Sequence, residues 1–136
     1  MILGIGGNNT AEVCHLLKTT DVSGFCAILS VSPYYNKPNQ KGIVQHYKYL
    51  ADASPLPIIL YNVPGRTGSN VGVEATLELA EHQNVLGTKE ASGNFSQCME
   101  ISTSSSFLSY DQIMISSMFP LNYPTTGSVS VTVHGL

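Results

Sequence analysis

The chain has 136 residues, and at roughly 100 to 200 residues per domain this length predicts one domain. Hydrophobic residues make up 43% and charged residues 11%, against roughly 25% charged in an average globular protein, which excludes charge-driven disorder. With 6 Lys and Arg against 9 Asp and Glu the net charge is −3, which excludes the basic surface that a nucleic-acid partner requires.

Short apolar runs alternate along the chain with stretches of helical periodicity. The predicted strands are, in chain order, Ile2 to Ile5, Phe25 to Val31, Pro57 to Asn62 and Val85 to Thr88. The predicted helices are Thr10 to Lys18, Ile43 to Ala51 and Val73 to Glu81, with a fourth expected after Asn94. This alternation, with strands apolar throughout, is typical of βαβ units in a parallel sheet covered on both faces.

Each of the first three predicted helices has one apolar face. The faces consist of Val13, Leu16 and Leu17 in the first helix, of Val44, Tyr47 and Leu50 or Ala51 in the second, and of Val73, Leu77 and Ala80 in the third. Glu74, Glu78 and Glu81 point outward from the third helix. Two α/β architectures fit these elements, a doubly wound sheet and a (β/α)₈ barrel of about 250 residues, of which this chain would supply about half.

The pattern weakens after about Ile101. Residues Ser102 to Ser106 are predicted to form a flexible polar stretch, and Phe107 to Tyr123 shows neither a helical nor a strand period. Ser128 to Val133 alternates Ser and Thr with Val and predicts one more strand. We therefore expect an α/β unit over residues 1–101 and a divergent segment of uncertain structure over residues 102–136.

The first of two chemical signals is the set of loops that follow three consecutive strands. Their sequences are S-P-Y-Y-N-K-P after Val31, Y-N-V-P-G-R-T-G at Tyr61 to Gly68 and T-K-E-A-S-G-N at Thr88 to Asn94. Because the carboxyl ends of parallel strands share one edge of the sheet, the loops are expected to converge there. The opening Gly4 to Asn9 matches a dinucleotide-binding motif weakly and favours instead a tight turn with a close backbone approach.

The second signal is a set of three reactive side chains in those loops. Lys89 ends an apolar run, where desolvation favours the neutral amine that attacks a ketone to form a Schiff base. Tyr61 also ends a strand, where its hydroxyl could relay protons. Arg66 is the only arginine of the chain and suits the capture of a substrate carboxylate. A surface lysine, a core tyrosine and a surface arginine are the alternatives.

The remaining composition argues against other classes of site. Cys14, Cys26 and Cys98 have no spacing typical of a disulfide framework or a zinc site, so we expect buried thiols. The four histidines show no metal-binding spacing, and no metal is expected. No apolar run reaches the roughly 18 residues of a membrane span, and no charged region typical of a signal peptide opens the chain, which together favour a cytoplasmic protein.

The motifs G-I-G-G-N-N-T, S-V-S-P-Y-Y-N-K-P, I-L-Y-N-V-P-G-R-T-G and G-T-K-E-A-S-G-N, in this order, closely resemble the dihydrodipicolinate synthase family, from Ile2 to about Ile101. The resemblance implies about half of a (β/α)₈ barrel, strands three to roughly seven. It implies a lyase of the diaminopimelate route to lysine that condenses pyruvate with aspartate semialdehyde to 4-hydroxy-tetrahydrodipicolinate, with no cofactor beyond an imine of pyruvate. It also implies a homo-oligomer, a dimer or tetramer.

Residue roles follow from the same resemblance. Lys89 matches the Schiff-base lysine, Tyr61 the proton-relay tyrosine and Arg66 the arginine that holds the second substrate's carboxylate. Tyr35 matches the tyrosine that reaches across a dimer interface, and Val129 a backbone position near pyruvate. The rivals are a sibling pyruvate-dependent aldolase or lyase and a non-catalytic truncated remnant.

Departures from the family pattern accompany these matches. The family's first two strands and its G-T-T-G-E loop are not found, and Tyr110 stands where the family has Gly. The 136-residue chain alone is therefore expected to have little condensation activity and to be prone to aggregation or dependent on association.

Overall fold

In the computed structural model, which describes residues 1–105, 107 and 115–116, the strands form one parallel sheet. They lie in the spatial order β1 (Ile2–Gly4), β2 (Ala27–Val31), β3 (Ile58–Asn62), β4 (Val85–Glu90) and β5 (Ile115–Ser116), and every neighbouring pair is parallel. All strands therefore end at the same edge, called here the carboxyl edge, and begin at the opposite amino edge. The predicted α/β class is confirmed.

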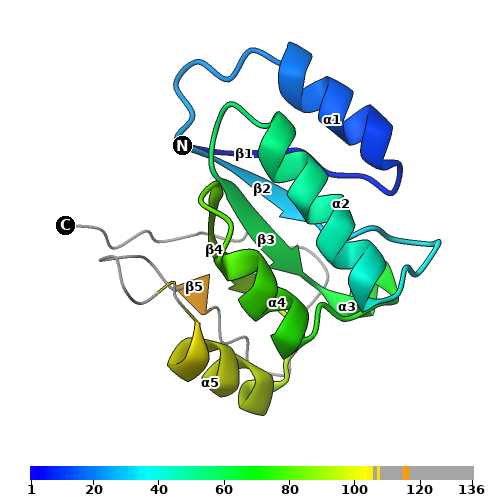
Figure 1. Ribbon diagram of the computed structural model, residues 1–136, viewed down its shortest axis with the longest axis vertical. Coiled ribbons are helices and arrows are strands. Elements are labelled where there is room, and N and C mark those ends of the chain that lie inside the picture. The colour runs from blue at the N-terminus through cyan, green and yellow to red at the C-terminus, as the bar shows by residue number, and fades with distance from the viewer. Residues whose placement is uncertain (106, 108–114, 117–136) are drawn as a thin grey trace, which may run out of the picture.

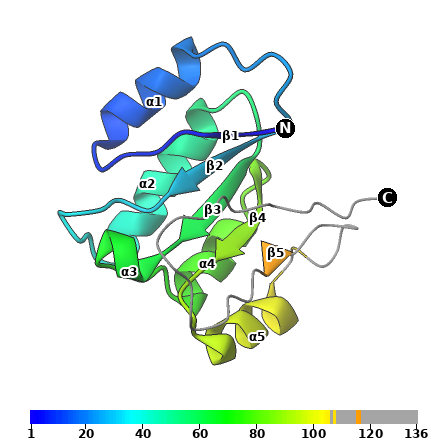
Figure 2. The same ribbon diagram turned by 180° about the vertical axis from the view of Figure 1, so that it is seen from behind.

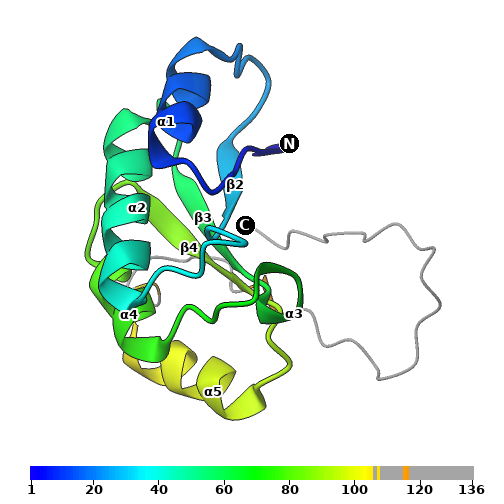
Figure 3. The ribbon, with the colours of Figure 1, turned by 90° about the vertical axis from the view of Figure 1, so that its right-hand side faces the viewer.

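The helices decide between the two candidate architectures. They are α1 (Thr10–Thr19), α2 (Gln40–Ala53), the short α3 (Pro64–Thr67), α4 (Val73–Ala80) and α5 (Phe95–Ser104). In Figure 1 the strands fan out in chain order, and in Figure 3 α1, α2 and α4 stand along one side of the sheet. From behind, the strands lie in front of α2 and α4 (Figure 2). A doubly wound sheet has helices on both faces, whereas sequential strands with helices on the outside form a barrel wall. The described part of the chain therefore has the arrangement of part of a barrel.

The core lies between the sheet and these helices. Ile28, Ile58 and Leu60 are fully buried beneath Tyr47 and Leu50 of α2. The Tyr47 hydroxyl donates a hydrogen bond of 2.9 Å to the Ser30 carbonyl, so the largest core side chain is also satisfied as a donor. The predicted apolar face of this helix is confirmed.

The other two predicted faces need correction. Val13 and Leu17 are buried in α1, but Leu16 is 47% exposed. In α4 the buried residues are Ala75, Thr76 and Leu79, while the predicted set, Val73, Leu77 and Ala80, is only half-buried. This helix packs against β4, α2 and α5 together, so Ala75, Thr76 and Leu79 face its neighbours rather than the expected residues.

Two local predictions also change. Helix α5 continues to Ser104, so the first three serine and threonine residues after Ile101 are helical rather than flexible. Helix α3 was not predicted, because its four residues, which begin with Pro64, are too few to show a helical period. The expected helix after Asn94 is confirmed, and the Asn94 side chain caps it by accepting from the Gln97 amide at 3.2 Å. The predicted strand 128–133 lies outside the described residues.

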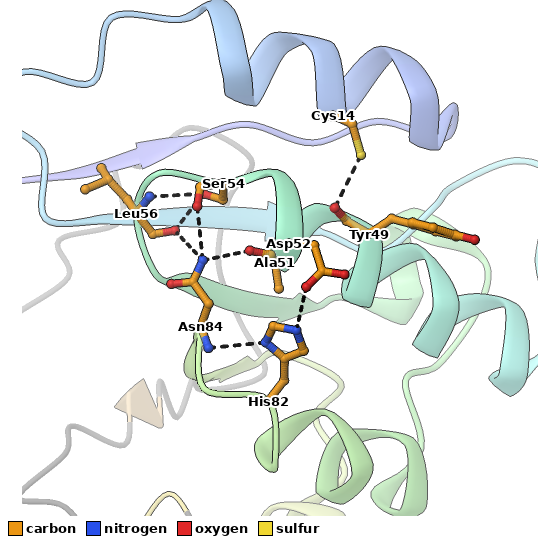
Figure 4. A network of polar contacts seen from close by, with 8 residues as sticks. All are labelled: Cys14, Tyr49, Ala51, Asp52, Ser54, Leu56, His82 and Asn84. Carbon is orange, nitrogen blue, oxygen red and sulfur yellow. Dashed lines mark hydrogen bonds and ion pairs between the residues drawn. The ribbon is translucent and has the colours of Figure 1, made fainter.

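A polar network closes the amino edge (Figure 4). The Asn84 side-chain amide donates to the carbonyls of Ala51 and Ser54 at 2.8 and 3.1 Å, and so caps the last turn of α2. His82 contacts the Asp52 carboxylate at 3.1 Å through Nε2 and accepts from the Asn84 backbone amide at 3.2 Å through Nδ1. The edge is thus closed by backbone capping and one histidine–aspartate contact.

Candidate active site

The predicted convergence of loops at the carboxyl edge is confirmed by contacts between neighbours. Asn8, after β1, donates to the Tyr34 carbonyl at 3.1 Å, and Asn36 donates back to the Asn8 carbonyl at 3.2 Å. A Cβ on Gly68, after β3, would lie 2.9 Å from Cε of Lys37, after β2, so these loops touch. The sheet thereby brings the predicted reactive segments to one edge.

The glycine-rich opening is a close-approach turn, as the sequence favours. A Cβ on Gly6 would lie 2.9 Å from Cγ1 and 3.0 Å from the backbone nitrogen of Val31, closer than real Cβ contacts allow. Only glycine lets this turn cross the end of β2 so tightly.

Lys89 and Tyr61 form one rung of the parallel ladder between β3 and β4. The Lys89 ammonium nitrogen lies 4.4 Å from the centre of the Tyr61 ring, within the range of a cation–π contact. Lys89 is only 8% exposed, whereas Tyr61 is half-buried. The sequence therefore predicted correctly that these two side chains lie together at the end of the sheet.

The pKa of Lys89 is lowered from its ordinary value. Burial is the main cause, because it disfavours the charged ammonium, and the positive charge of Arg66 is the second. A lower pKa increases the fraction of neutral amine near neutral pH, and the neutral amine is the nucleophile toward a ketone. The cluster can thus form an imine, with a tyrosine beside the reacting nitrogen.

Arg66 lies on α3 and is exposed. The helix ends at Thr67 and is capped by Gly68, whose backbone is left-handed with φ +74°. The Thr67 hydroxyl donates to the Ser69 carbonyl at 2.8 Å. This short, closed turn holds an exposed guanidinium close enough to act on the Lys89 charge. The geometry suits an anion that approaches from solvent.

Tyr35 is placed differently. Its side chain is 88% exposed and therefore does not pack into the Tyr61–Lys89 cluster of its own chain. Its backbone and that of Lys37 are left-handed, with φ 71° and 44°, an unusual conformation for residues with long side chains. Its role across an interface stays a prediction, and Val129 lies outside the described residues.

The sequence reasoning missed a second polar cluster on the next rung. Asn62 pairs with Glu90 in the ladder, and Nδ2 of Asn62 donates to the carboxylate at 2.9 Å. Asn70 and Gln97 join this pair by side-chain hydrogen bonds. Asn62 and Glu90 directly follow Tyr61 and Lys89, so two polar residues in succession at a strand end were the available signal.

The remaining candidates carry little chemistry. The three cysteines are free, but Cys26 is exposed, and Cys14 and Cys98 are half-buried, which corrects the expectation of buried thiols. The described residues hold no group of three or more His, Cys, Asp or Glu side chains suited to a metal ion. No helix in that part of the chain is long and apolar enough to cross a membrane.

Comparison with known proteins points to one family. The sequence model of the dihydrodipicolinate synthetase family matches residues 1–135. The chain is 59% identical over 102 residues to 4-hydroxy-tetrahydrodipicolinate synthase of Flavobacterium psychrophilum, an alignment of 74% of this chain and 35% of that protein. The chain thus spans about a third of the length of the curated relatives it matches.

Solved structures agree. The enzyme from Cyanidioschyzon merolae with lysine bound superposes with a TM-score of 0.73 at 44% identity, covering 77% of this chain and 36% of that one. The chloride-inhibited dihydrodipicolinate synthase from Acinetobacter baumannii in complex with pyruvate gives a TM-score of 0.73 at 43% identity, covering 78% and 36%.

Proposed function

Because the chain belongs to the dihydrodipicolinate synthetase family, we propose that it carries the Schiff-base centre of a 4-hydroxy-tetrahydrodipicolinate synthase. The observation that carries the proposal is the buried Lys89 amine beside the Tyr61 ring, at the carboxyl edge of a barrel-type parallel sheet. Sites of this fold occur at that edge. The proposed substrates are pyruvate and aspartate semialdehyde.

The proposed first step is imine formation on Lys89. The neutral amine attacks the ketone carbon of pyruvate, a C–N bond forms, and the carbonyl oxygen leaves as water after taking up two protons. Tyr61 is the proposed relay of these protons, since its ring lies against the amine. The imine then loses a proton from the pyruvate methyl group to give the carbon nucleophile.

The proposed second step is attack of that carbon on the aldehyde of aspartate semialdehyde, which forms a C–C bond and turns the aldehyde oxygen into a hydroxyl by uptake of a proton. The substrate's amino group then attacks the imine carbon and closes the ring, and the C–N bond to Lys89 breaks to return the free amine. Arg66 is the proposed partner of the aldehyde's carboxylate, because it is exposed on a closed turn beside Lys89. It also favours this reaction over that of a sibling aldolase whose second substrate has no small carboxylate. No cofactor enters this scheme, since the protonated imine of Lys89 with pyruvate is the electron sink.

The proposal extends to the protein's setting. The reaction belongs to the diaminopimelate route to lysine, in the cytoplasm. A second copy of the chain is the proposed partner. The exposed Tyr35 is the residue that is proposed to reach across the interface into the site of that copy.

Borohydride reduction with pyruvate tests the central step. We expect one stable adduct, located on Lys89 by peptide mass mapping, while the other lysines, Lys18, Lys37, Lys41 and Lys48, stay unmodified and serve as internal controls. Folded protein with an unmodified Lys89 peptide would refute the proposal and favour the non-catalytic alternative.

A further inference from the structure

Two neighbouring rungs of the ladder between β3 and β4 point to opposite sides of the sheet. Tyr61 pairs with Lys89, and Asn62 pairs with Glu90. Because successive side chains of a strand alternate between faces, the second pair lies on the face opposite the reactive amine. Contact with Gln97 of α5 identifies this as the helix-covered face.

The Glu90 carboxylate on this face accepts hydrogen bonds from three donors. Glu90 is 8% exposed and accepts from Asn62 Nδ2, from the Ser92 backbone amide and from Gln97 Nε2, each at 2.9 Å. No cationic side chain in the described part of the chain forms an ion pair with it. Burial of a carboxylate costs folding free energy unless each of its hydrogen bonds is kept. Glu90 therefore holds its three donors in place.

Asn62 carries this constraint to the turn that holds Arg66. Its Oδ1 accepts from the Val71 backbone amide at 3.0 Å, and its Nδ2 lies 2.8 Å from Oδ1 of Asn70. These bonds close the segment 63–70 at its base. Gln97 supports the same closure, because it accepts from Nδ2 of Asn70 at 2.8 Å.

We propose that Glu90 is a positioning residue that, through Asn62 and Gln97, holds the Arg66 turn beside Lys89. Lys89 itself needs no such support, since its strand pairs with β3 on one side and β5 on the other. Backbone hydrogen bonds close the turn on itself. Its base is anchored by side chains: Asn62 and Gln97 belong to the Glu90 network, and Gln40 of α2 adds an anchor outside it. The inference rests on the proposed function for its use in catalysis, but its structural content can be tested alone.

Glu90→Gln is the informative variant, with Glu100→Gln on the exposed face of α5 as its matched control. The new amide nitrogen cannot accept a hydrogen bond, so at least one of the three donors loses its acceptor. Hydrogen exchange in the full chain should accelerate about fivefold or more at the Val71 amide, while the Ile28 amide, bonded to the Pro57 carbonyl, keeps its rate. Equal acceleration at both amides, or at neither, overturns the proposal.

The second readout is the pH profile of Lys89 acetylation by trace acetic anhydride, with the exposed Lys41 as internal reference. Arg66 contributes to the lowered pKa of Lys89, so a loosened turn should move the midpoint to higher pH. Loss of the negative charge of Glu90 would by itself move the midpoint to lower pH, because a nearby negative charge stabilises the ammonium form of Lys89. A shift to higher pH therefore reports the position of Arg66 and supports the proposal, and a shift to lower pH or none overturns it.

A double-variant cycle isolates the route through Arg66. In the Arg66→Ala background, Glu90→Gln should no longer move the midpoint to higher pH. An undiminished upward shift in that background overturns the proposal. Should Glu90→Gln fail to fold, Gln97→Ala removes one donor to the same carboxylate and is expected to change exchange and acetylation in the same directions.

Pyruvate trapping on the same variants keeps the two proposals apart. Acetylation and hydrogen exchange need no imine, so they test the positioning of Arg66 even in a chain that pyruvate does not label. A wild-type chain without an adduct removes the proposed function alone, whereas unchanged exchange and acetylation in Glu90→Gln remove the positioning role alone.

Discussion

The two edges of the sheet are each organised by one asparagine next to a strand end. At the amino edge, Asn84 precedes β4 and donates to backbone carbonyls of α2 and the following turn. At the carboxyl edge, Asn62 ends β3 and joins a buried carboxylate to the turn that carries Arg66. An asparagine side chain therefore caps a helix at one edge, and at the other an asparagine side chain connects the Glu90 carboxylate to the turn that carries Arg66.

This difference separates stability from chemistry. The amino edge satisfies its backbone groups with neutral partners, and its His82–Asp52 contact includes an aspartate side chain that is 71% exposed. The carboxyl edge contains a desolvated lysine, a carboxylate held by neutral donors and two left-handed residues with long side chains. Such features cost folding free energy and are typical of functional sites, so the edges should respond differently to substitution.

The largest effect is expected at the carboxyl edge from Arg66→Ala. It is measured in a chimaera in which residues 2–101 of this chain replace the matching segment of the Flavobacterium psychrophilum enzyme. Arg66 is exposed in the free chain, and the bound substrate would shield its pair with the carboxylate from water. Loss of that charge-assisted pair should weaken the binding of aspartate semialdehyde by roughly 2 to 5 kcal/mol, more than tenfold in apparent affinity. The apparent affinity for pyruvate should change little. Equal losses for both substrates in steady-state kinetics would contradict the assignment.

A buried ionisable group away from both edges should act on stability alone. His46 on α2 is 3% exposed, and burial lowers its pKa from 6.5 to about 4. The folded state thus favours neutral His46. The stability that His46 contributes in this way is fully present above pH 6.5 and is lost as the pH falls toward 4. The two pKa values correspond to a loss of about 3 kcal/mol.

Urea unfolding between pH 7 and pH 4 measures this loss. His46→Asn should remove most of the pH dependence, whereas His15→Asn on the exposed face of α1 should keep it. Neither substitution should change the rate at which pyruvate labels Lys89. A change of that rate in His46→Asn alone would show that the helix layer and the carboxyl edge are coupled.

The sequence predicts much of this fold because its strands are locally determined. All four apolar runs became parallel strands, and the reactive pair followed from strand ends alone, since Val31, Tyr61 and Lys89 occupy matching positions of the ladder. In a parallel sheet, the residues at the carboxyl ends of the apolar strands must all lie at the carboxyl edge.

The missed features depend on tertiary contacts. The buried face of α4 is set by three neighbours and not by its own period. The partners of Glu90 lie 28 positions away on β3 and 7 positions away on α5. The local signal, two polar residues in succession at a strand end, therefore does not identify these partners. The network at this edge is a product of packing, which a single sequence does not display.

A smaller effect is expected at the amino edge from Asn84→Ala. The variant leaves two carbonyl groups at the end of α2 without their donor. Each such hydrogen bond contributes about 0.5 to 1.5 kcal/mol net, so the two lost bonds together cost about 1 to 3 kcal/mol. Urea unfolding should show a loss in that range, while Gln83→Ala at the neighbouring exposed position should change stability little. Pyruvate labelling of Lys89 should be unaffected, and a parallel loss of labelling would break the separation of the edges.

The smallest effect is expected for Asp52→Asn, which removes the charge opposite His82. Nε2 of His82 lies 3.1 Å from the carboxylate, but solvent screens the pair because the Asp52 side chain is 71% exposed. Exposed pairs contribute roughly 0 to 1 kcal/mol, and the asparagine oxygen can still accept a hydrogen bond. The unfolding free energy should therefore fall by less than about 1 kcal/mol, and by still less in high salt. A loss as large as that of Asn84→Ala would mean that the amino edge, like the carboxyl edge, depends on a charge, and the contrast between capping and charge would then fail.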